Sequence, residues 1–278
     1  MPTFATPEPI TATLTTAGAE VRIAASDRLD TVVRVQPINR ESASDVKVAE
    51  KTKVEFADGE LTIKTTKSGD KNGSVAITVE LPAGSRLALY TAWSDVHADG
   101  ALGDCELNMS SGQVHLDRIA AVRGDLSTGG VTIGHIAGTA TFQGGAADVR
   151  IGEVGGVLKY QGSNGKVSIG RALSDIDLNG ANGSFTIDRA DGSVIAKAAK
   201  CPIRIGQLSR GEADLANASG GIEIGVSEGT SAAVDARSTK GAVHNSLPAQ
   251  DSPAQAGEHV KIFARTRLDD IVIHRATA

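Results

Sequence analysis

The sequence predicts an all-β protein, a parallel β-solenoid of about seven 18-residue coils with an N-terminal β-rich cap and C-terminal closing strands. Three observations lead to this prediction. Pairs of apolar residues recur at a constant spacing, and glycine commonly follows them where a turn is expected. The 278 residues also include 32 glycines but only 3% aromatic residues, so the core must be aliphatic and closely spaced.

The repeat consists of two interleaved series of apolar-x-apolar triplets. The first steps by 18 residues and finally by 19: Val131/Ile133, Val149/Ile151, Val167/Ile169, Phe185/Ile187, Ile203/Ile205 and Ile222/Ile224. The second lies about nine residues away and steps likewise: Ala140/Phe142, Leu158/Tyr160, Ile176/Leu178, Val194/Ala196 and Ala213/Leu215. Weaker outer copies are Val114/Leu116 and Val243.

Each triplet reads as one short strand with two side chains facing inward and one facing outward. Two strands and two turns make a coil, and stacked coils place residues 18 apart next to each other. The nine-residue spacing favours two main faces, whereas three six-residue sides would also give 18. An antiparallel sandwich would give no reason for a constant period.

We divide the chain into a cap, a solenoid and a C-terminal segment. Residues 1–97 show strand alternation without the 18-residue repeat, and we expect a small antiparallel layer there. Residues 98–247 form the repeat domain. Residues 248–278 comprise a loop and two closing strands, which either close the end of the solenoid or return to the cap. Such caps would protect sheet edges from aggregation.

Charge and hydropathy exclude several kinds of partner. The net charge is −5, and the positive residues are scattered singly, so no basic stripe for nucleic acid is expected. No apolar run is long enough for a membrane span, and Met1–Pro9 lacks the basic and apolar segments of a signal peptide. We therefore expect a cytoplasmic protein that binds a protein partner or itself, with no evident small-molecule substrate.

The two cysteines are predicted to be buried free thiols. Cys105 and Cys201 are 96 residues apart and neither lies in a Cys-x-x-Cys pair. In the solenoid they would be about five coils, or roughly 24 Å, apart, which is too far for a disulfide.

The register predicts no catalytic residues. Polysaccharide-cleaving β-helices need acids clustered on neighbouring coils. Positions 18 apart instead pair opposite charges: Asp148 with Lys166, Lys159 with Asp177, and Glu153 with Arg171. Asp99 and Asp117 are also 18 apart, but Asp99 precedes the clear repeat.

The sequence also predicts no metal site and no cofactor. The nonapeptides lack the Gly and Asp of calcium-binding β-rolls, and Asp188 and Asp191 appear isolated. The six histidines show no His-Glu-x-x-His and no close pair; they are His97, His115, His135, His244, His259 and His274. Ser-x-x-Lys occurs at 68–71 and 163–166 without supporting elements. Phe142 and Tyr160 read as a stacked core pair rather than a sugar platform.

The chain resembles a bacterial family of β-strand-repeat proteins usually labelled "putative adhesin". The resemblance covers nearly the whole chain and rests on the opening residues 4–10, Asp30–Val33, the turn Glu80–Ser85, the repeated Gly-x-Val-x-Ile-Gly units and the closing segments 264–266 and 270–273. It implies a β-solenoid with no assigned enzymatic activity and offers no functional residues.

Together these features predict a non-enzymatic structural or interaction protein whose rigid faces are the working surface. The expected contact face is the outward ladder Thr132, Arg150, Ser168, Thr186, Arg204 and Glu223. One alternative is a self-assembling scaffold like the bactofilins. Another is a carbohydrate-binding or carbohydrate-active β-helix, which would need stacked acids or exposed aromatic residues; neither is evident in the repeat.

Overall fold

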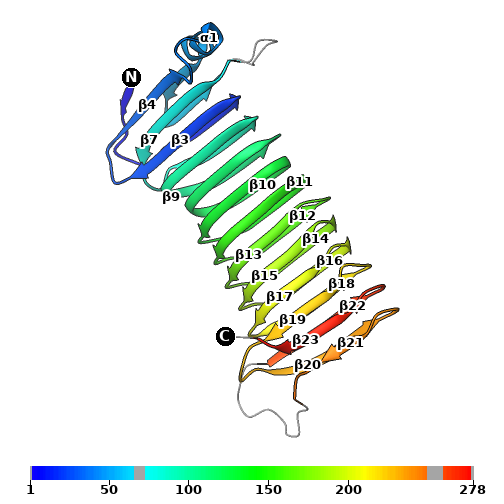
Figure 1. The fold of residues 1–278 in the computed structure, drawn as a ribbon. Coiled ribbons are helices and arrows are strands. Elements are labelled where there is room, and N and C mark those ends of the chain that lie inside the picture. Colours follow the sequence, from blue (N-terminus) through cyan, green and yellow to red (C-terminus); the bar gives the residue numbers. More distant parts are fainter. Residues whose placement is uncertain (1, 66–72, 249–258, 277–278) are drawn as a thin grey trace. The chain divides into compact units, whose positions relative to one another are not determined.

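The computed structural model describes residues 2–65, 73–248 and 259–276 (Figure 1). The chain forms two compact units, residues 1–137 and 138–278, which we call the N-terminal unit and the C-terminal unit. Apart from one short helix, both units are built from strands, most of which pair in parallel, so the predicted all-β, solenoid-like class is confirmed.

Parallel strands of the C-terminal unit stack in two series. One series runs β11 (Ala140–Val154), β12 (Leu158–Gly162), β14 (Ile176–Asn182), β16 (Val194–Lys200), β18 (Gly211–Asn217), β22 (His259–Thr266) and β20 (Ser231–Ser238). The other runs β11, β13 (Lys166–Ala172), β15 (Ser184–Ala190), β17 (Ile203–Leu208), β19 (Ile222–Val226), β23 (Ile271–Arg275) and β21 (Val243–Asn245).

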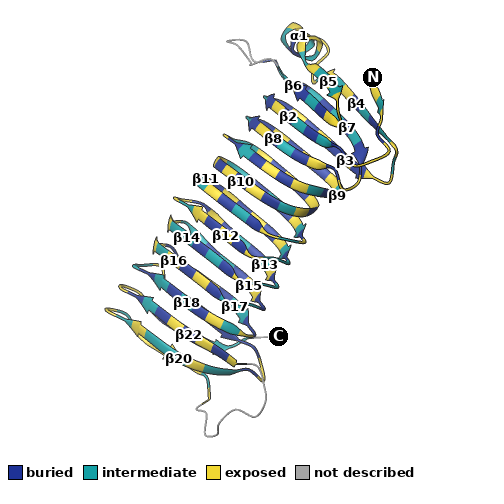
Figure 2. Cartoon of the chain, turned by 180° about the vertical axis from the view of Figure 1, so that it is seen from behind, coloured by how far each residue is buried: buried dark blue, intermediate teal, exposed yellow. Residues whose placement is uncertain are grey.

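The predicted register is confirmed from β11 to β18 in one series and from β11 to β19 in the other. Val149 lies opposite Val167, and the same step of 18 continues down both series. The step of 19 falls where predicted, with Ile205 opposite Ile224. Figure 2 shows the expected alternation of buried residues with intermediate or exposed ones at the start of strands such as β14 and β16. Because successive side chains of a strand point to opposite faces, a shift of the strand register by one residue would turn the polar outward side chains into the core.

The C-terminal strands adopt neither of the two arrangements that the sequence left open. β22 pairs with β18 on one side and β20 on the other, and β23 likewise lies between β19 and β21. The last coil of the chain, β22 and β23, therefore lies between β18/β19 and β20/β21, so β20 and β21 are at the end of the stack although they come earlier in the sequence. Its inward side chains Val260, Ile262 and Ile271 are fully buried, so burial on both sides stabilises this insertion.

Carboxylates also hold neighbouring coils together through the backbone. Asp148 Oδ1 accepts a hydrogen bond from the backbone N–H of Lys166 at 2.9 Å, and Asp175 Oδ1 accepts one from Ser193 at 2.9 Å. The predicted neighbours Asp148 and Lys166 are thus adjacent, but the contact made is with the amide rather than the ammonium. A charged acceptor makes a stronger hydrogen bond than a neutral one.

The N-terminal unit contains a helix and strands of both directions. Its elements are β1 (Thr3–Ala5), β2 (Thr11–Ala17), β3 (Ala19–Ser26), β4 (Asp30–Pro37), α1 (Ala43–Lys51), β5 (Lys53–Ala57), β6 (Glu60–Lys64), β7 (Val75–Pro82), β8 (Arg86–Ala92), β9 (Ser94–Met109) and β10 (Gly112–Ile136).

The antiparallel layer expected for residues 1–97 is wrong for most of these strands. β2 lies between β6 and β8, and β3 lies between β7 and β9, all in parallel. Among the described residues, antiparallel pairing is found for β1–β4, β4–β7 and β5–β6. Strand alternation reports which face is buried and not the direction of the neighbour, which is why the sequence did not reveal this. The division at residues 97 and 247 stays a prediction, and β9 runs across the first of these positions.

Helix α1 was not predicted, although its start carries a recognisable signal. Ser42 is the N-cap, and its hydroxyl accepts a hydrogen bond from the N–H of Asp45 at 3.3 Å. The pattern Ser-x-x-Asp resembles a capping box. Asp45 in turn accepts hydrogen bonds from the backbone N–H groups of Asn39 and Ser74, which ties the helix to the strands beside it.

Candidate functional site

The predicted outward ladder exists in the C-terminal unit. Arg150, Ser168, Thr186, Arg204 and Glu223 follow one another in register on adjacent strands. Thr132, the first predicted member, belongs to the N-terminal unit and is not counted with them. The five residues sit at the outward-facing middle position of their strands, so they present a polar column on a flat sheet face.

A depression of about 570 Å³ lies at the lower end of this ladder, around Arg204 and Glu223. Arg204 Nε is 3.6 Å from Glu223 Oε2, and His274 Nε2 is 3.4 Å from Glu223 Oε1. Two aliphatic side chains line the same depression: Leu268 is 45% exposed and Val272 is 37% exposed. Arginine beside exposed aliphatic groups is a combination that protein interfaces favour.

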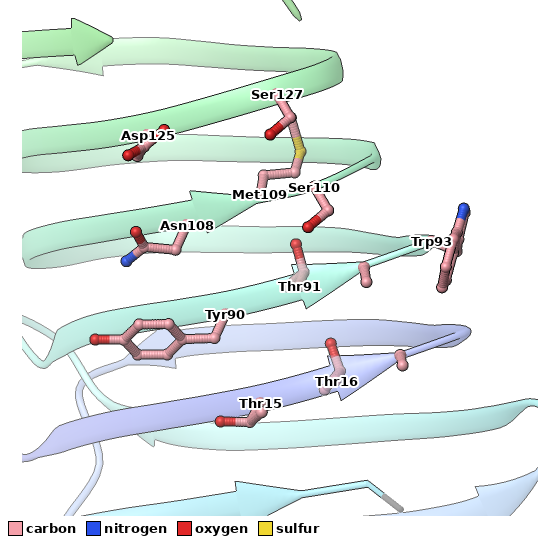
Figure 3. Close-up of a pocket in the computed structure, with 12 residues that line it drawn as sticks. Thr15, Thr16, Tyr90, Thr91, Trp93, Asn108, Met109, Ser110, Asp125 and Ser127 are labelled. Atoms are coloured by element: carbon pink, nitrogen blue, oxygen red, sulfur yellow. The ribbon is translucent and has the colours of Figure 1, made fainter. Parts of the chain in front are cut away.

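A second surface, which we call the threonine groove, lies in the N-terminal unit and has a volume of about 580 Å³ (Figure 3). One wall is a ladder of outward residues in register, Thr15, Tyr90, Asn108 and Asp125. The next outward positions toward the turn carry only the small residues Ala17, Ala92, Ser110 and Ser127, which form the floor. Trp93 closes the far side at the turn.

The two aromatic residues of the groove are exposed. Trp93 is 74% exposed and Tyr90 is 40% exposed. Glu106 Oε1 accepts hydrogen bonds from the Tyr90 hydroxyl at 3.3 Å and from Asn108 Nδ2 at 2.9 Å, which fixes the wall. The negative charge of Glu106 also raises the pKa of Tyr90, and burial and this hydrogen bond act in the same direction.

The buried acid Asp191 has a structural role. Asp191 is 8% exposed and receives Arg171 on one neighbouring coil, Arg189 beside it and Ser209 on the other neighbouring coil. Burial by itself raises the pKa of Asp191, but the hydrogen bonds from Arg189, Ser209 and Arg171 outweigh it and lower that pKa below its ordinary value. The sequence suggested that Asp191 is isolated, and the structure corrects this. Its partners are cations and a hydroxyl, which suit a bridge between coils and not an acid catalyst.

Two histidines lie close together, contrary to the expectation drawn from sequence spacing. His115 is in register with His97, and their ring centroids are 6.0 Å apart. His97 Nε2 is also 3.0 Å from Asp99 Oδ1. In the part of the chain that the structure describes, no group of three or more His, Cys, Asp or Glu side chains is arranged to hold a metal ion.

The predicted charge pairs are neighbours, whereas Asp99 and Asp117 are not paired in register, because the pairing of β9 with β10 shifts between Leu116 and Arg118. Glu153 lies opposite Arg171, with their charged atoms 3.8 Å apart, and Lys159 lies opposite Asp177. In the N-terminal unit, Glu20 lies opposite Asp95, so two acids are neighbours there. Both of these side chains are exposed.

The remaining sequence motifs give no site. Ser68 and Lys71 lie outside the described residues. In the second Ser-x-x-Lys, the backbone N–H of Ser163 bonds to Gly145 and that of Lys166 bonds to Asp148, as backbone links between coils. Phe142 and Tyr160 are buried neighbours in register. Tyr160 makes an edge-to-face contact with Phe185 at 6.0 Å, as is typical of a core.

Both cysteines are buried free thiols, as predicted. Burial raises the pKa of Cys105 to about 12 and that of Cys201 to about 11. Since the thiolate is the nucleophile, neither thiol suits catalysis.

We expect a thiol reagent such as Ellman's reagent to label neither Cys105 nor Cys201 in the folded protein at mildly alkaline pH. Both should react at once after unfolding in guanidinium chloride, because unfolding removes the burial that raises their pKa values. The unfolded sample is the control for reagent activity. Rapid labelling of the folded chain would contradict the buried positions of the two thiols.

A family model described as Toastrack DUF4097 matches residues 12–271. The chain belongs to the Toastrack DUF4097 family. The family match confirms the predicted resemblance to a β-strand-repeat family, and the parallel strand pairings of this chain are solenoid-like. No curated protein matches the chain.

Several solved bacterial structures are similar to this Toastrack chain over almost its full length. A "putative adhesin" from Parabacteroides distasonis is 12% identical, with 98% of this chain and 95% of that chain covered and a TM-score of 0.40. One from Bacteroides fragilis is 13% identical, with 98% and 95% covered and a TM-score of 0.35. A "putative lipid binding protein" from P. distasonis is 11% identical, with 99% and 96% covered and a TM-score of 0.37.

Sequence reasoning about this Toastrack chain missed the threonine groove. Its residues lie on β2, β8, β9 and β10, and β2 enters the stack out of chain order. One signal was present: Trp93 is the single tryptophan, and it stands directly after a strand at a turn position. No helix in the described ranges is long and apolar enough to cross a membrane.

Proposed function

We propose that this chain is a non-enzymatic binding protein whose outer face in the C-terminal unit contacts a protein partner. The depression at Arg204 carries the proposal, because it combines a charged ladder with the exposed aliphatic side chains of Leu268 and Val272. Interface cores favour arginine and apolar contacts, whereas isolated surface charges contribute little. The proposal includes the predicted stack of about seven coils with an N-terminal cap, which would hold this face rigid.

The arrangement of charges supports the non-enzymatic part of this proposal. Glu153 and Asp191 each lie beside Arg171, so both acids are paired with a cation rather than clustered with other acids. We also propose a cytoplasmic location. It is supported by the free, buried state of both cysteines, which suits a reducing compartment.

The test is a paired charge reversal. We expect Arg150→Glu with Arg204→Glu to remove a partner that the unchanged chain captures from native lysate, because the two new carboxylates would repel an acidic partner surface that the arginines attract. Lys159→Glu with Lys200→Glu is the matched control, since it changes the net charge equally on the other strand series. Quantitative mass spectrometry of the captured proteins gives the readout. An identical list of captured proteins for the two double variants would contradict the proposal that this face contacts the partner.

Self-assembly is a second candidate, favoured by one observation. Among the residues that the structure describes, β20 has a strand partner, β22, on one side only, so its other edge is open to pairing. The charges of Asp235 and Arg237 on this strand oppose continuous edge-to-edge growth. Light scattering over a concentration series tests it: a dimer supports this candidate, and a monomer at the highest concentration removes it.

A further inference from the structure

We propose that the threonine groove binds a neutral carbohydrate, with Trp93 as the platform for one pyranose ring. This goes beyond the protein partner proposed above, because it concerns a different surface in the other unit. The groove has the two features that sugar binding requires. An aromatic face can pack against the C–H groups of a ring, and polar side chains of mixed donor and acceptor character can bind its hydroxyls.

The shape of the groove follows from the strand register. Thr15, Tyr90, Asn108 and Asp125 stand on adjacent coils, so this wall repeats at about 4.8 Å per coil. Four coils therefore give a wall roughly 14 Å long. Beside it lies the floor of alanine and serine, where no large side chain rises from the sheet. Figure 3 shows Tyr90 and Trp93 at opposite ends of the lining, with Thr91 and Ser110 between them.

Trp93 occupies a position where a structural role would favour glycine. Its φ is +49°, a conformation that is an outlier for a bulky residue. Gly18, which follows the register partner of Ala92 on the neighbouring coil, has φ +65°. The backbone N–H of Trp93 bonds to Ser111 Oγ at 3.2 Å, which helps to hold this conformation. A strained side chain that is 74% exposed contributes little to the stability of the fold. Binding a ligand is a role that would account for a tryptophan at this position.

The chemistry of the lining selects the class of ligand. None of its residues is Lys, Arg or His, and Asp125 supplies a negative charge, so phosphate groups and acidic polysaccharides would be repelled. Most of the lining surface is apolar, but an acyl chain would leave the hydroxyls, the Asn108 amide and the Asp125 carboxylate without hydrogen-bond partners. Glu106 already fixes Tyr90 and Asn108, so little side-chain entropy is lost on binding. A neutral sugar satisfies all three conditions.

The test uses the full chain and defined probes. Cellohexaose, xylohexaose, mannohexaose and chitohexaose represent neutral sugars, whereas heparin and phosphatidylglycerol vesicles represent acidic polysaccharide and lipid. Trp93 is the single tryptophan, so its fluorescence reports binding directly. We expect at least one neutral oligosaccharide to shift this emission, and neither anionic probe to do so.

Trp93→Gly separates a binding role from a structural one. Calorimetric titration should show affinity for that oligosaccharide reduced by about tenfold or more. The melting temperature should not fall, because glycine adopts this backbone conformation without strain. Tyr90→Ala should weaken binding as well. Phe263→Ala is the control, since it removes an exposed aromatic ring in the other unit and should leave affinity unchanged.

Three outcomes would overturn the proposal: no binding of any neutral probe, binding that Trp93→Gly leaves intact, or binding of heparin or vesicles alone. The charge reversals of Arg150 and Arg204 concern the other unit, so failure of the protein-partner proposal leaves this one standing, and the reverse also holds.

Discussion

Removal of residues 249–278 is expected to unfold β20 and β21, although both strands precede the cut. Among the described residues, β20 pairs with β22 and β21 pairs with β23, so the truncation removes the strand partner of each. It also removes the inward side chains of Val260, Ile262 and Ala264, all fully buried. Each large aliphatic side chain lost from a core typically costs about 2–5 kcal/mol, so the combined effect should exceed that of any single substitution in this unit.

Hydrogen exchange measured by mass spectrometry tests this expectation. Peptides covering β20 and β21 should become unprotected in the truncated chain, whereas peptides from β12 to β15, which lie farther up the stack, should keep their protection. If the C-terminal strands merely closed the end of the stack, β20 and β21 would stay protected after the cut, and that result would contradict the inserted coil.

Two point variants on one strand provide a matched control. Ile262 is fully buried, while its neighbour Phe263 is 37% exposed. We expect Ile262→Ala to lower the free energy of unfolding by about 2–5 kcal/mol and Phe263→Ala by much less. Equal effects would show that β22 does not lie between two coils with the observed register.

Asp191→Ala is expected to lower the free energy of unfolding by about 3 kcal/mol. This value is at the low end for a broken buried ion pair, because Arg171 and Arg189 are about half exposed and can turn to water. Ser209 loses its acceptor as well. Asp188→Ala is the control, since it removes the same charge from an exposed position on the same coil and should change stability by about 0.5 kcal/mol or less. Urea unfolding curves measure both.

The same carboxylate predicts a pH dependence of stability. The pKa of Asp191 is lowered in the folded chain, so its contribution is fully present above the ordinary aspartate pKa of about 3.9. It is then lost as the pH falls through the folded value, because the folded state must take up a proton that it binds weakly. We expect Asp191→Asn to show a shallower loss of unfolding free energy in this acid range. Equal slopes of unfolding free energy against pH for the unchanged chain and for Asp191→Asn would contradict a stabilising role of the Asp191 carboxylate.

The sequence alone determined the class, the repeat and the register. Residues 18 apart, such as Val149 and Val167, are neighbours because each coil must stack its apolar pair on the next one to bury it. The same arithmetic predicted the Arg150–Arg204 ladder and the Glu153–Arg171 pair. Local periodicity suffices for such contacts, since every partner lies at a fixed distance along the chain.

Only the tertiary structure decided where the ends of the chain go and what they form. β2 and β22 each enter a stack between two strands that lie far from them in the sequence. No sequence period encodes these positions. They depend on which open sheet edge can bury both sides of an arriving strand. The threonine groove depends on the first of these insertions, because Thr15 reaches Tyr90 only through it. For that reason the repeat predicted the scaffold, whereas the candidate sugar site became visible only in the folded chain.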